Sequence, residues 1–330
     1  MRAPALQRLP SLSSYASLPI NKRRKGGRRG RAVRGSWVLA IFIIGILAAA
    51  RSGRADEFRA GSFTKSTGGA PASQSVAHGL GATPKALILW TVGKTGSSFA
   101  THHHFSIGFS DGTTSKSVTA SSQGSVSTSN SSRRMANKAL TIVEYGETLL
   151  AEADLSSWDA TSFTLNWTTN NSTAYVIHFI AFYAPSISAK VLEWTMGTST
   201  GNRAVTGVGF RPAFVLHAYA GDGFTSSLPA TAADCAIGLG VMDASGNQWA
   251  NMILGLDNVS NSDAQRGQQT DACLYSFDNS LAVTKEASWT SMDSDGFTVN
   301  FSTANSNAGQ VISLALTGLN VKVGSFAKAS

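Results

Sequence analysis

The sequence predicts an all-β protein built from two tandem, similar antiparallel β-sandwich or jelly-roll-like domains. The first reason is a repeat: Phe163–Trp167 (FTLNW) reappears later in the chain as Phe297–Phe301 (FTVNF). The second is that short runs of β-branched and aromatic residues alternate with clusters of Ser, Thr, Gly and Asn along the whole chain. Regularly spaced short strands of this kind are typical of sandwiches and jelly rolls.

The repeat extends well beyond one strand. Gly81–Ile88 matches Gly209–Leu216, so the repeating unit has the length of a domain and is not a short solenoid repeat. Further matches in the same order are Ile107-Gly108 with Ile237-Gly238, Arg133 with Arg266, Trp158 with Trp289, and Val176-Ile177 with Val311-Ile312. The spacing predicts a first domain at 56–186 and a second at 187–330, which differ by small loop insertions.

Each copy contains a series of expected strands. In the first copy these are Phe58–Thr64 at an edge, Lys85–Val92, Phe105–Phe109, Ala139–Tyr145, Ser162–Thr168 and Tyr175–Phe182. In the second they are Lys190–Met196, Ala213–Tyr219, Cys235–Met242, Gln248–Leu254, Ala272–Phe277, Gly296–Ser302 and Gln310–Leu316. Helical periodicity is scarce, and only Thr148–Asp154 is expected to form one helical turn. Phe163, Trp167, Phe297 and Phe301 alternate along their strands and are expected to fill the two cores.

Residues 1–55 form a basic leader with twelve Lys and Arg and no acidic residue. An apolar segment at 37–50 follows the basic region, and small residues precede Asp56, which is the pattern of a signal peptide. The segment is short for a bilayer span, which needs about 20 residues, so we expect a secreted or cell-surface protein. An uncleaved anchor and a wrongly assigned start codon remain the alternatives, and the leader would then be the only link to a membrane.

The charge of the rest of the chain argues against nucleic-acid binding. The 27 basic residues include the twelve of the leader, so residues 56–330 hold 15 basic and 19 acidic residues and carry a net charge of −4. A nucleic-acid partner requires a basic face on the folded body.

Two cysteines, Cys235 and Cys273, both lie in the second copy. Export permits a disulfide between them, and two buried thiols on neighbouring strands are the alternative.

Several motifs together resemble a family of tandem β-sandwich proteins found in tailed-phage and prophage genomes. They are Gly79–Trp90, Ile107–Gly112, Ser132–Arg134, Phe163–Trp167 and Val176–Phe179, and the resemblance covers about residues 58–320. Members of this family are taken as tail- or virion-associated structural proteins. The resemblance implies a virion or tail-protein partner and brings no catalytic residue. The leader departs from it, because virion proteins assemble in the cytoplasm.

Three motifs suggest chemistry, and each has a simpler interpretation. His102 and His104 would share one face of a strand and could ligate a metal, with Asp111 or Glu144 as a third ligand. Ser110 lies in a Gly-x-Ser-x-Gly pattern, but the nucleophile elbow needs a following helix and the sequence predicts a turn. Asp293–Gly296 begins like a calcium loop, although the twelfth position, where a Glu is needed, is Ala304. An exposed histidine cluster and two tight turns are the simpler interpretations.

A ligand site has weaker candidates. Arg133 and Arg266 recur at equivalent places just before a strand and could pair with carboxylates or bind a ligand. Trp90 and Trp249, with Trp194 and Tyr219, could offer aromatic platforms to a sugar, although aromatics in sandwiches are usually core. His178 and His217 lie in apolar strands and are expected to be structural.

The sequence therefore predicts a non-enzymatic, exported structural or adhesive protein without a cofactor. Homo-oligomers and a surface glycan or tail protein are the expected partners. A carbohydrate-binding, lectin-like surface module is the alternative, and a metal-dependent or serine hydrolase is the remaining one.

Overall fold

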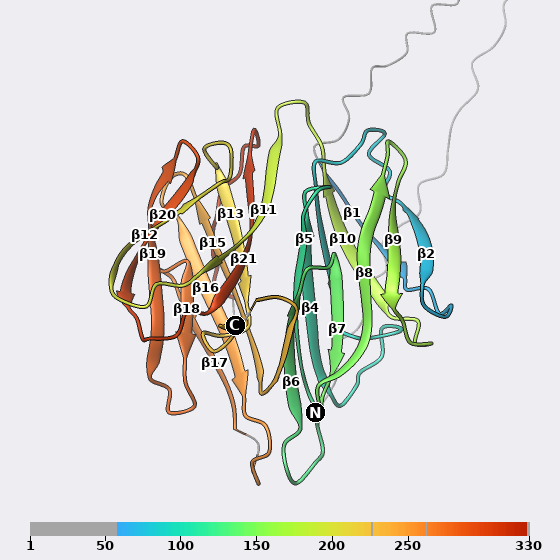
Figure 1. Ribbon diagram of the computed structural model, residues 1–330, viewed down its shortest axis with the longest axis horizontal. Coiled ribbons are helices and arrows are strands. Elements are labelled where there is room, and N and C mark those ends of the chain that lie inside the picture. Colours follow the sequence, from blue (N-terminus) through green and yellow to red (C-terminus); the bar gives the residue numbers. More distant parts are fainter. Residues whose placement is uncertain (1–57, 226, 262, 329–330) are drawn as a thin grey trace, which may run out of the picture. The chain divides into compact units, whose positions relative to one another are not determined.

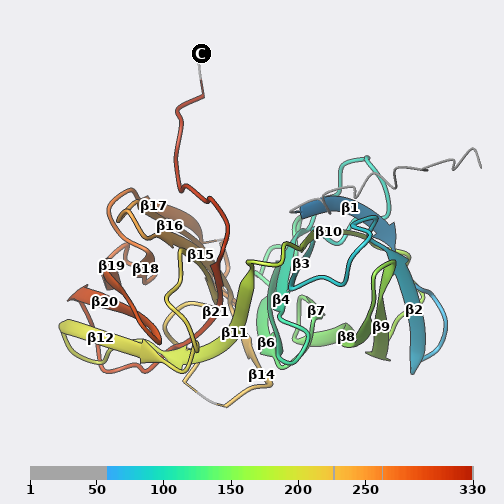
Figure 2. The same cartoon turned by 90° about the horizontal axis from the view of Figure 1, so that it is seen from above.

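The computed structural model describes residues 58–225, 227–261 and 263–328, and these fold into strands and loops without a helix. No helix that could span a membrane therefore occurs in the described part of the chain. The leader, with its apolar segment 37–50 and the small residues expected to precede cleavage at Asp56, lies outside the described residues. Four antiparallel sheets form two sandwich-like bodies, which confirms the predicted fold class (Figures 1 and 2).

The two halves of the chain hold corresponding sets of strands. The first half consists of β1 (Phe58–Thr64), β2 (Ala72–Ala77), β3 (Ala86–Thr91), β4 (His103–Ser110), β5 (Ser115–Ser122), β6 (Ser131–Ala136), β7 (Leu140–Glu144), β8 (Thr148–Trp158), β9 (Ser162–Thr169) and β10 (Val176–Phe182). The second half consists of β11 (Ser188–Thr195), β12 (Gly201–Thr206), β13 (Phe214–Tyr219), β14 (Ala230–Ala233), β15 (Cys235–Asp243), β16 (Gln248–Gly255), β17 (Ala264–Gln269), β18 (Leu274–Phe277), β19 (Val283–Asp293), β20 (Gly296–Thr303) and β21 (Gln310–Thr317).

Strand order shows that the two halves are copies of one topology. The large sheet of the first half runs β1-β10-β3-β4-β5-β6, and that of the second runs β11-β21-β13-β15-β16-β17. The small sheets run β2-β9-β8-β7 and β12-β20-β19-β18. Every strand of the first half thus has a counterpart in the second, and β14 is the one addition.

Strand register corrects three of the sequence matches. Trp158 pairs with Phe163 as Met292 pairs with Phe297, so the counterpart of Trp158 is Met292 and not Trp289. Leu89 pairs with Gly108 and with Phe179, while its counterpart His217 pairs with Gly240 and with Ser313. Gly108 is therefore equivalent to Gly240 and not to Gly238. The same register makes Ile177 the counterpart of Val311. The glycines have a steric reason, since a Cβ on Gly108 would clash with the carbonyl of Ala139 and one on Gly240 with that of Cys273.

The expected strands all form, with ends shifted by at most two residues. The expected helical turn at Thr148–Asp154 is wrong, because this segment begins strand β8 and pairs with both β7 and β9. Its Leu, Ala and Glu residues favour a helix in isolation, but pairing with two neighbouring strands overrides that preference. Glu152, buried in β8, accepts hydrogen bonds from Arg134 Nε (2.8 Å) and Thr141 Oγ1 (3.0 Å).

Each half has its own core between a large and a small sheet. Phe163 and Trp167 from β9 are fully buried in the first core, and Phe297 and Phe301 from β20 in the second. This confirms the role predicted for the repeated aromatic residues. Because the same alternating aromatics fill both cores, their repetition is explained by packing.

A third apolar cluster joins the two halves. It lies between the outer faces of the two large sheets and includes Ile107 and Val118 from the first half and Ala218, Ile312 and Leu314 from the second. The contacting strands are β4, β5 and β6 on one side and β11, β13, β15 and β21 on the other. The second set corresponds to β1, β3, β4 and β10, so the two halves meet through different parts of the same sheet.

Strand β14 crosses from one half to the other. It lies in the β13–β15 connection of the second half but pairs with β6, from Ala230 opposite Met135 to Ala233 opposite Ser132. The first large sheet therefore has seven strands, and its β6 edge is covered by the second half (Figure 2).

Candidate functional site

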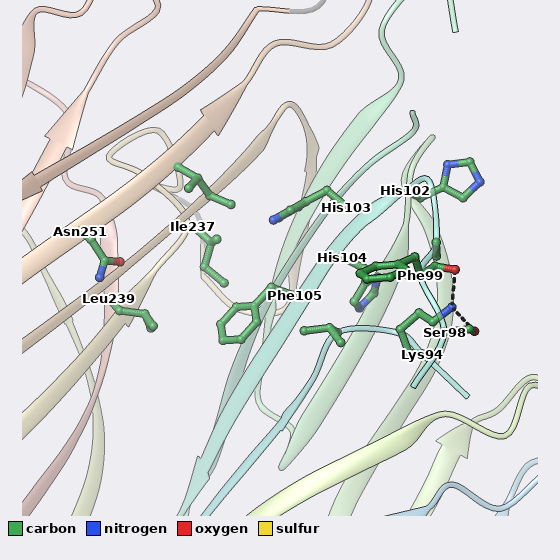
Figure 3. A pocket seen from close by; sticks show the side chains of 13 residues that line it. Lys94, Ser98, Phe99, His102, His103, His104, Phe105, Ile237, Leu239 and Asn251 are labelled. Carbon is green, nitrogen blue, oxygen red and sulfur yellow. Dashed lines mark hydrogen bonds between the residues drawn. The ribbon is translucent and has the colours of Figure 1, made fainter. Parts of the chain in front are cut away.

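A groove of 440 Å³ lies where the β3–β4 connection of the first half faces the outer side of β15 and β16 (Figure 3). We call this connection, residues 92–102, the Phe99 loop. The loop and the start of β4 form one wall, and Ile237, Leu239, Asn251 and Ile253 form the other. Lys94 Nζ holds the loop by donating to the carbonyl of Phe99 (3.2 Å) and to Ser98 Oγ (3.4 Å). The groove is mainly apolar, with a few polar groups at its rim.

The three consecutive histidines point in different directions (Figure 3). His102 Nδ1 accepts a hydrogen bond from the Gly124 amide (3.1 Å), and its ring lies beside Tyr145. His103 points across the groove toward the second half, where its Nδ1 lies 3.8 Å from Cys235 Sγ. His104 Nε2 lies 2.9 Å from Ser106 Oγ on the inner side of the sheet.

Burial lowers the pKa of two of these rings. Burial lowers the pKa of His104 to about 4, and the nearby His103 contributes to the shift. Partial desolvation also lowers the pKa of His103, although this side chain keeps an exposed part. An imidazole ring can accept and donate hydrogen bonds, so the exposed part of His103 suits a polar ligand at the groove rim.

The metal site suggested for His102 and His104 is not assembled. The described residues contain no group of three or more His, Cys, Asp or Glu side chains that could hold a metal ion. Asp111 follows the far end of β4, about 27 Å along the strand from His103. Its Oδ1 accepts from the amides of Thr113 and Thr114, and its Oδ2 accepts from that of Val191.

The other two motifs are turns. Ser110 and Gly112 sit in the hairpin between β4 and β5, where Ser110 Oγ donates to the Thr114 carbonyl (3.3 Å). The strand-turn-helix of a nucleophile elbow is thus replaced by strand-turn-strand. Asp295 joins β19 to β20 and accepts hydrogen bonds from the amides of Gly207 (3.1 Å) and Gly209 (2.6 Å). Both carboxylate oxygens of Asp295 therefore serve backbone amides.

Arg133 and Arg266 lie within β6 and β17, and not before a strand as the sequence suggested. They are structural counterparts, since Arg133 pairs with Ala120 and Arg266 with Ile253 on the outer faces of equivalent sheets. Their surroundings differ. The Arg133 guanidinium is buried 5.4 Å over the Phe224 ring and faces the charges of Asp222 and Asp234, whereas Arg266 is exposed. Among the described residues, neither arginine forms an ion pair.

Two of the four aromatic candidates are core residues. Trp194 and Tyr219 are buried in the second core, so they offer no platform to a sugar. Trp90 is half-buried and stacks on His178 with ring centroids 5.4 Å apart. Trp249 is also half-buried, and its buried Nε1 has no partner among the described residues.

The two cysteines are free and buried in different clusters. Cys273 lies against Gly240 of β15, five residues along this strand from Cys235. That distance is about 17 Å at 3.3 Å per residue, which is too far for a disulfide. The structure therefore corrects the proposed Cys235–Cys273 bridge, and burial raises the pKa of both thiols to about 12.

Sequence reasoning missed the most exposed aromatic residue at the groove. Phe99 is 103% exposed. It lies in a Gly/Ser-rich connection, which by composition reads as an ordinary loop. Comparison with the equivalent connection of the second copy, where Ser227-Leu228-Pro229-Ala230-Thr231 parallels Ser98-Phe99-Ala100-Thr101, would have singled it out.

The arrangement suits binding. It presents an exposed aromatic ring, two histidines and the Asn251 amide around an apolar groove, next to β17, which is the last strand of its sheet in the part of the chain that the structure describes. Comparison of the chain with protein-family models, with curated proteins and with solved structures finds no match.

Proposed function

We propose that this chain is a non-enzymatic, exported structural or adhesive protein whose sandwiches associate through the faces and edges of their large sheets. The resemblance to tandem sandwich proteins of phage tails supports this assignment, and so does the export-type leader for a surface location. Among alternatives, assembly accounts for more of the observed architecture than any small site does.

The observation that carries the proposal is the apolar cluster between the halves. The outer face of an antiparallel sheet is often solvated, yet here Ile107, Val118, Ile312 and Leu314 are all buried on outer faces. An ion pair between Lys116 and Glu193 (2.6 Å) ties β5 to β11 across the same contact. These sandwiches are therefore built to bury sheet against sheet, which is what repeated assembly requires.

The two side chains that could act as nucleophiles have structural roles. Ser110 Oγ is used within its hairpin, and Cys235 is a buried thiol whose pKa is raised to about 12, far from a reactive thiolate. The proposal therefore assigns no catalytic residue to the chain.

The mass of the full-length purified protein in solution tests the proposal. We expect light scattering coupled to size exclusion to show a mass above that of the 34.5 kDa chain that rises with protein concentration. A constant monomer mass over the accessible concentration range would contradict an assembly role.

A glycan-binding function is the second candidate, and Phe99 favours it. A fully exposed aromatic ring beside Lys94, with the Asn251 amide on the opposite wall of the groove, offers stacking and hydrogen bonding to a sugar (Figure 3). Calorimetric titration with surface glycans should then show binding that Asn251→Ala and Phe99→Ala each weaken. Binding unaffected by both variants would remove this groove as a glycan site.

A further inference from the structure

We propose that two molecules associate by strand addition: the Phe99 loop of one molecule pairs with the β17 edge of a second copy. The contact would repeat, between chains, the contact that β14 makes with β6 within one chain. This inference rests on the proposed assembly function and specifies the surface that it uses.

The internal contact supplies the pattern. β14 adds to the edge of the first large sheet, with Ala230 opposite Met135 and Ala232 opposite Arg133. Leu228, just before β14, is 9% exposed and belongs to the apolar cluster between the halves. Strand pairing and one anchoring side chain thus act together.

The second half presents the same edge without a partner. β17 is the counterpart of β6, and it is the last strand of its sheet among the described residues. Its outward residues Ala264, Arg266 and Gln268 are exposed. A free edge exposes backbone N–H and C=O groups that can pair with another chain.

The first half has the corresponding loop, but this loop pairs with no strand edge among the described residues. The Phe99 loop is the counterpart of the β13–β15 connection that contains β14, because each connects the same two strands of its copy. Ser98-Phe99-Ala100-Thr101 corresponds to Ser227-Leu228-Pro229-Ala230-Thr231, with Pro229 as an insertion. Phe99 is 103% exposed where Leu228 is buried, so the loop has the anchor but lacks the surface that would cover it.

The internal contact also leaves one free surface of each kind. It joins β4, β5 and β6 of the first half to β11, β13, β15 and β21 of the second. The latter strands correspond to β1, β3, β4 and β10, so the two contacting surfaces are not equivalent. A contact between non-equivalent surfaces is heterologous and does not satisfy both surfaces of a pair. Each molecule therefore retains one unpaired loop, the Phe99 loop, and one unpaired strand edge, that of β17. A second copy of the chain supplies the partner for each.

The internal register predicts the partners in the contact between chains. Transferring the pairs of β14 and β6 places Ala100 opposite Gln268, Thr101 opposite Gly267 and His102 opposite Arg266. Opposed residues in an antiparallel pair have Cα atoms about 4.5–5.5 Å apart, which is within the range of a disulfide.

Mixing two variants that each carry one introduced cysteine tests this register in the full chain. We expect Ala100→Cys protein mixed with Gln268→Cys protein to form a disulfide-linked heterodimer under mild oxidation. The two native cysteines are buried, so the cross-linking seen with unsubstituted protein measures the background. As a matched control, Gln268→Cys is replaced by Asn202→Cys, on the exposed edge strand β12 of the same half. Equal cross-linking in both mixtures would overturn the proposal.

Phe99→Asp tests the anchor. Phe99 is exposed in the single chain, so the substitution should leave folding unchanged and weaken association at least about tenfold, because a buried aromatic side chain is lost from the contact. Phe326→Asp is the control, since Phe326 is 94% exposed and lies outside the contact. Equal association constants for the two variants would count against the anchor.

The outcomes separate this inference from the proposed function. Self-association that persists with neither the selective cross-link nor a Phe99 effect would retain assembly and overturn this surface. A monomer at every concentration would overturn both.

Discussion

At the residue scale, His217 has a chain of hydrogen bonds inside the second core. Trp194 Nε1 donates to Ser313 Oγ (2.8 Å), and His217 Nδ1 lies 2.7 Å from the same oxygen. Nε2 has no partner among the described residues and lies among aromatic rings that include Phe297, 5.5 Å away between centroids.

Buried histidines make stability depend on pH. Burial lowers the pKa of His217 to about 3 and of His104 to about 4, from 6.5. Between pH 6.5 and 4 the unfolded chain therefore binds more protons than the folded one. The resulting stability is fully present above pH 6.5 and decreases as the pH falls, by up to about 1.4 kcal/mol per pH unit for each ring.

Urea unfolding at about pH 7 and about pH 5 measures this dependence. We expect His217→Leu, which introduces the residue of the equivalent position Leu89, to reduce the slope by about one ring's contribution. A slope identical to that of the unsubstituted protein would show that His217 is not a source of the pH dependence.

A buried ammonium group occupies the same place in both halves but comes from different strands. In the first half, Lys65 follows β1 and its Nζ donates to the carbonyls of Ser66 (2.9 Å) and Asn171 (2.8 Å). In the second half, Lys285 from β19 reaches the carbonyls of Gly197 (2.6 Å) and Asn305 (2.7 Å), the counterparts of those two residues. The shared requirement is a cation beneath these loop carbonyls.

Lys285→Met should therefore destabilise the protein. The substitution keeps the apolar stem but leaves two carbonyls without their donor, and we expect a loss of about 1–3 kcal/mol in the free energy of unfolding. Denaturant unfolding measures it, with the partly exposed Lys190→Met as the control expected to change little. Equal stabilities of the two variants would argue against a structural role for the ammonium.

At the scale of elements, β14 is a short strand with a large contact. It has four residues, and Arg134 Nη1 donates to its Thr231 Oγ1 (2.7 Å). Leu228 and the Phe224 ring over Arg133 cover the outer face of β6 beside it. The β13–β15 connection therefore holds the two halves together at the β6 edge.

Leu228→Ala tests this role. We expect a loss of about 2–4 kcal/mol, as for other buried leucines, and faster amide exchange in β6 than in the unsubstituted protein. Leu281→Ala is the control, because Leu281 is 66% exposed. Unchanged exchange in β6 would mean that the strand pairs without the leucine anchor.

At the scale of the whole molecule, the described residues contain three apolar clusters, and the middle one couples the two sandwiches. Leu314 and Ile312 of β21 contribute fully buried side chains to it. Two bodies that share a core of this kind are expected to unfold together.

Leu314→Asp should separate their unfolding. A charge placed in the shared cluster disfavours the contact but not the core of either half, so calorimetry should show two transitions in place of one. The control is Leu281→Asp, since Leu281 is 66% exposed and belongs to none of the three clusters, and one transition should remain. A single transition in Leu314→Asp would show that the halves are coupled by other contacts.

The sequence by itself predicted the all-β class, the duplication and the core aromatics, because alternation and repeated motifs are local properties of the chain. Phe163, Trp167, Phe297 and Phe301 are buried as their alternation predicts. It also predicted the turns at Ser110 and Asp295, because Asp-Gly turn chemistry is local.

Tertiary structure alone decided the features that depend on contacts between distant segments. Thr148–Trp158 is a strand because it pairs with strands on both sides. Cys235 and Cys273 are too far apart to form a disulfide, because Cys235 begins β15 and Cys273 lies against Gly240, five residues further along that strand. Arg133 is half-buried against the Phe224 ring while Arg266 is exposed, although register makes them counterparts, because β14 adds to the β6 edge and not to β17. Identical local sequence patterns thus acquire different surroundings through packing, and only the folded chain shows which of the two repeats leaves its edge open.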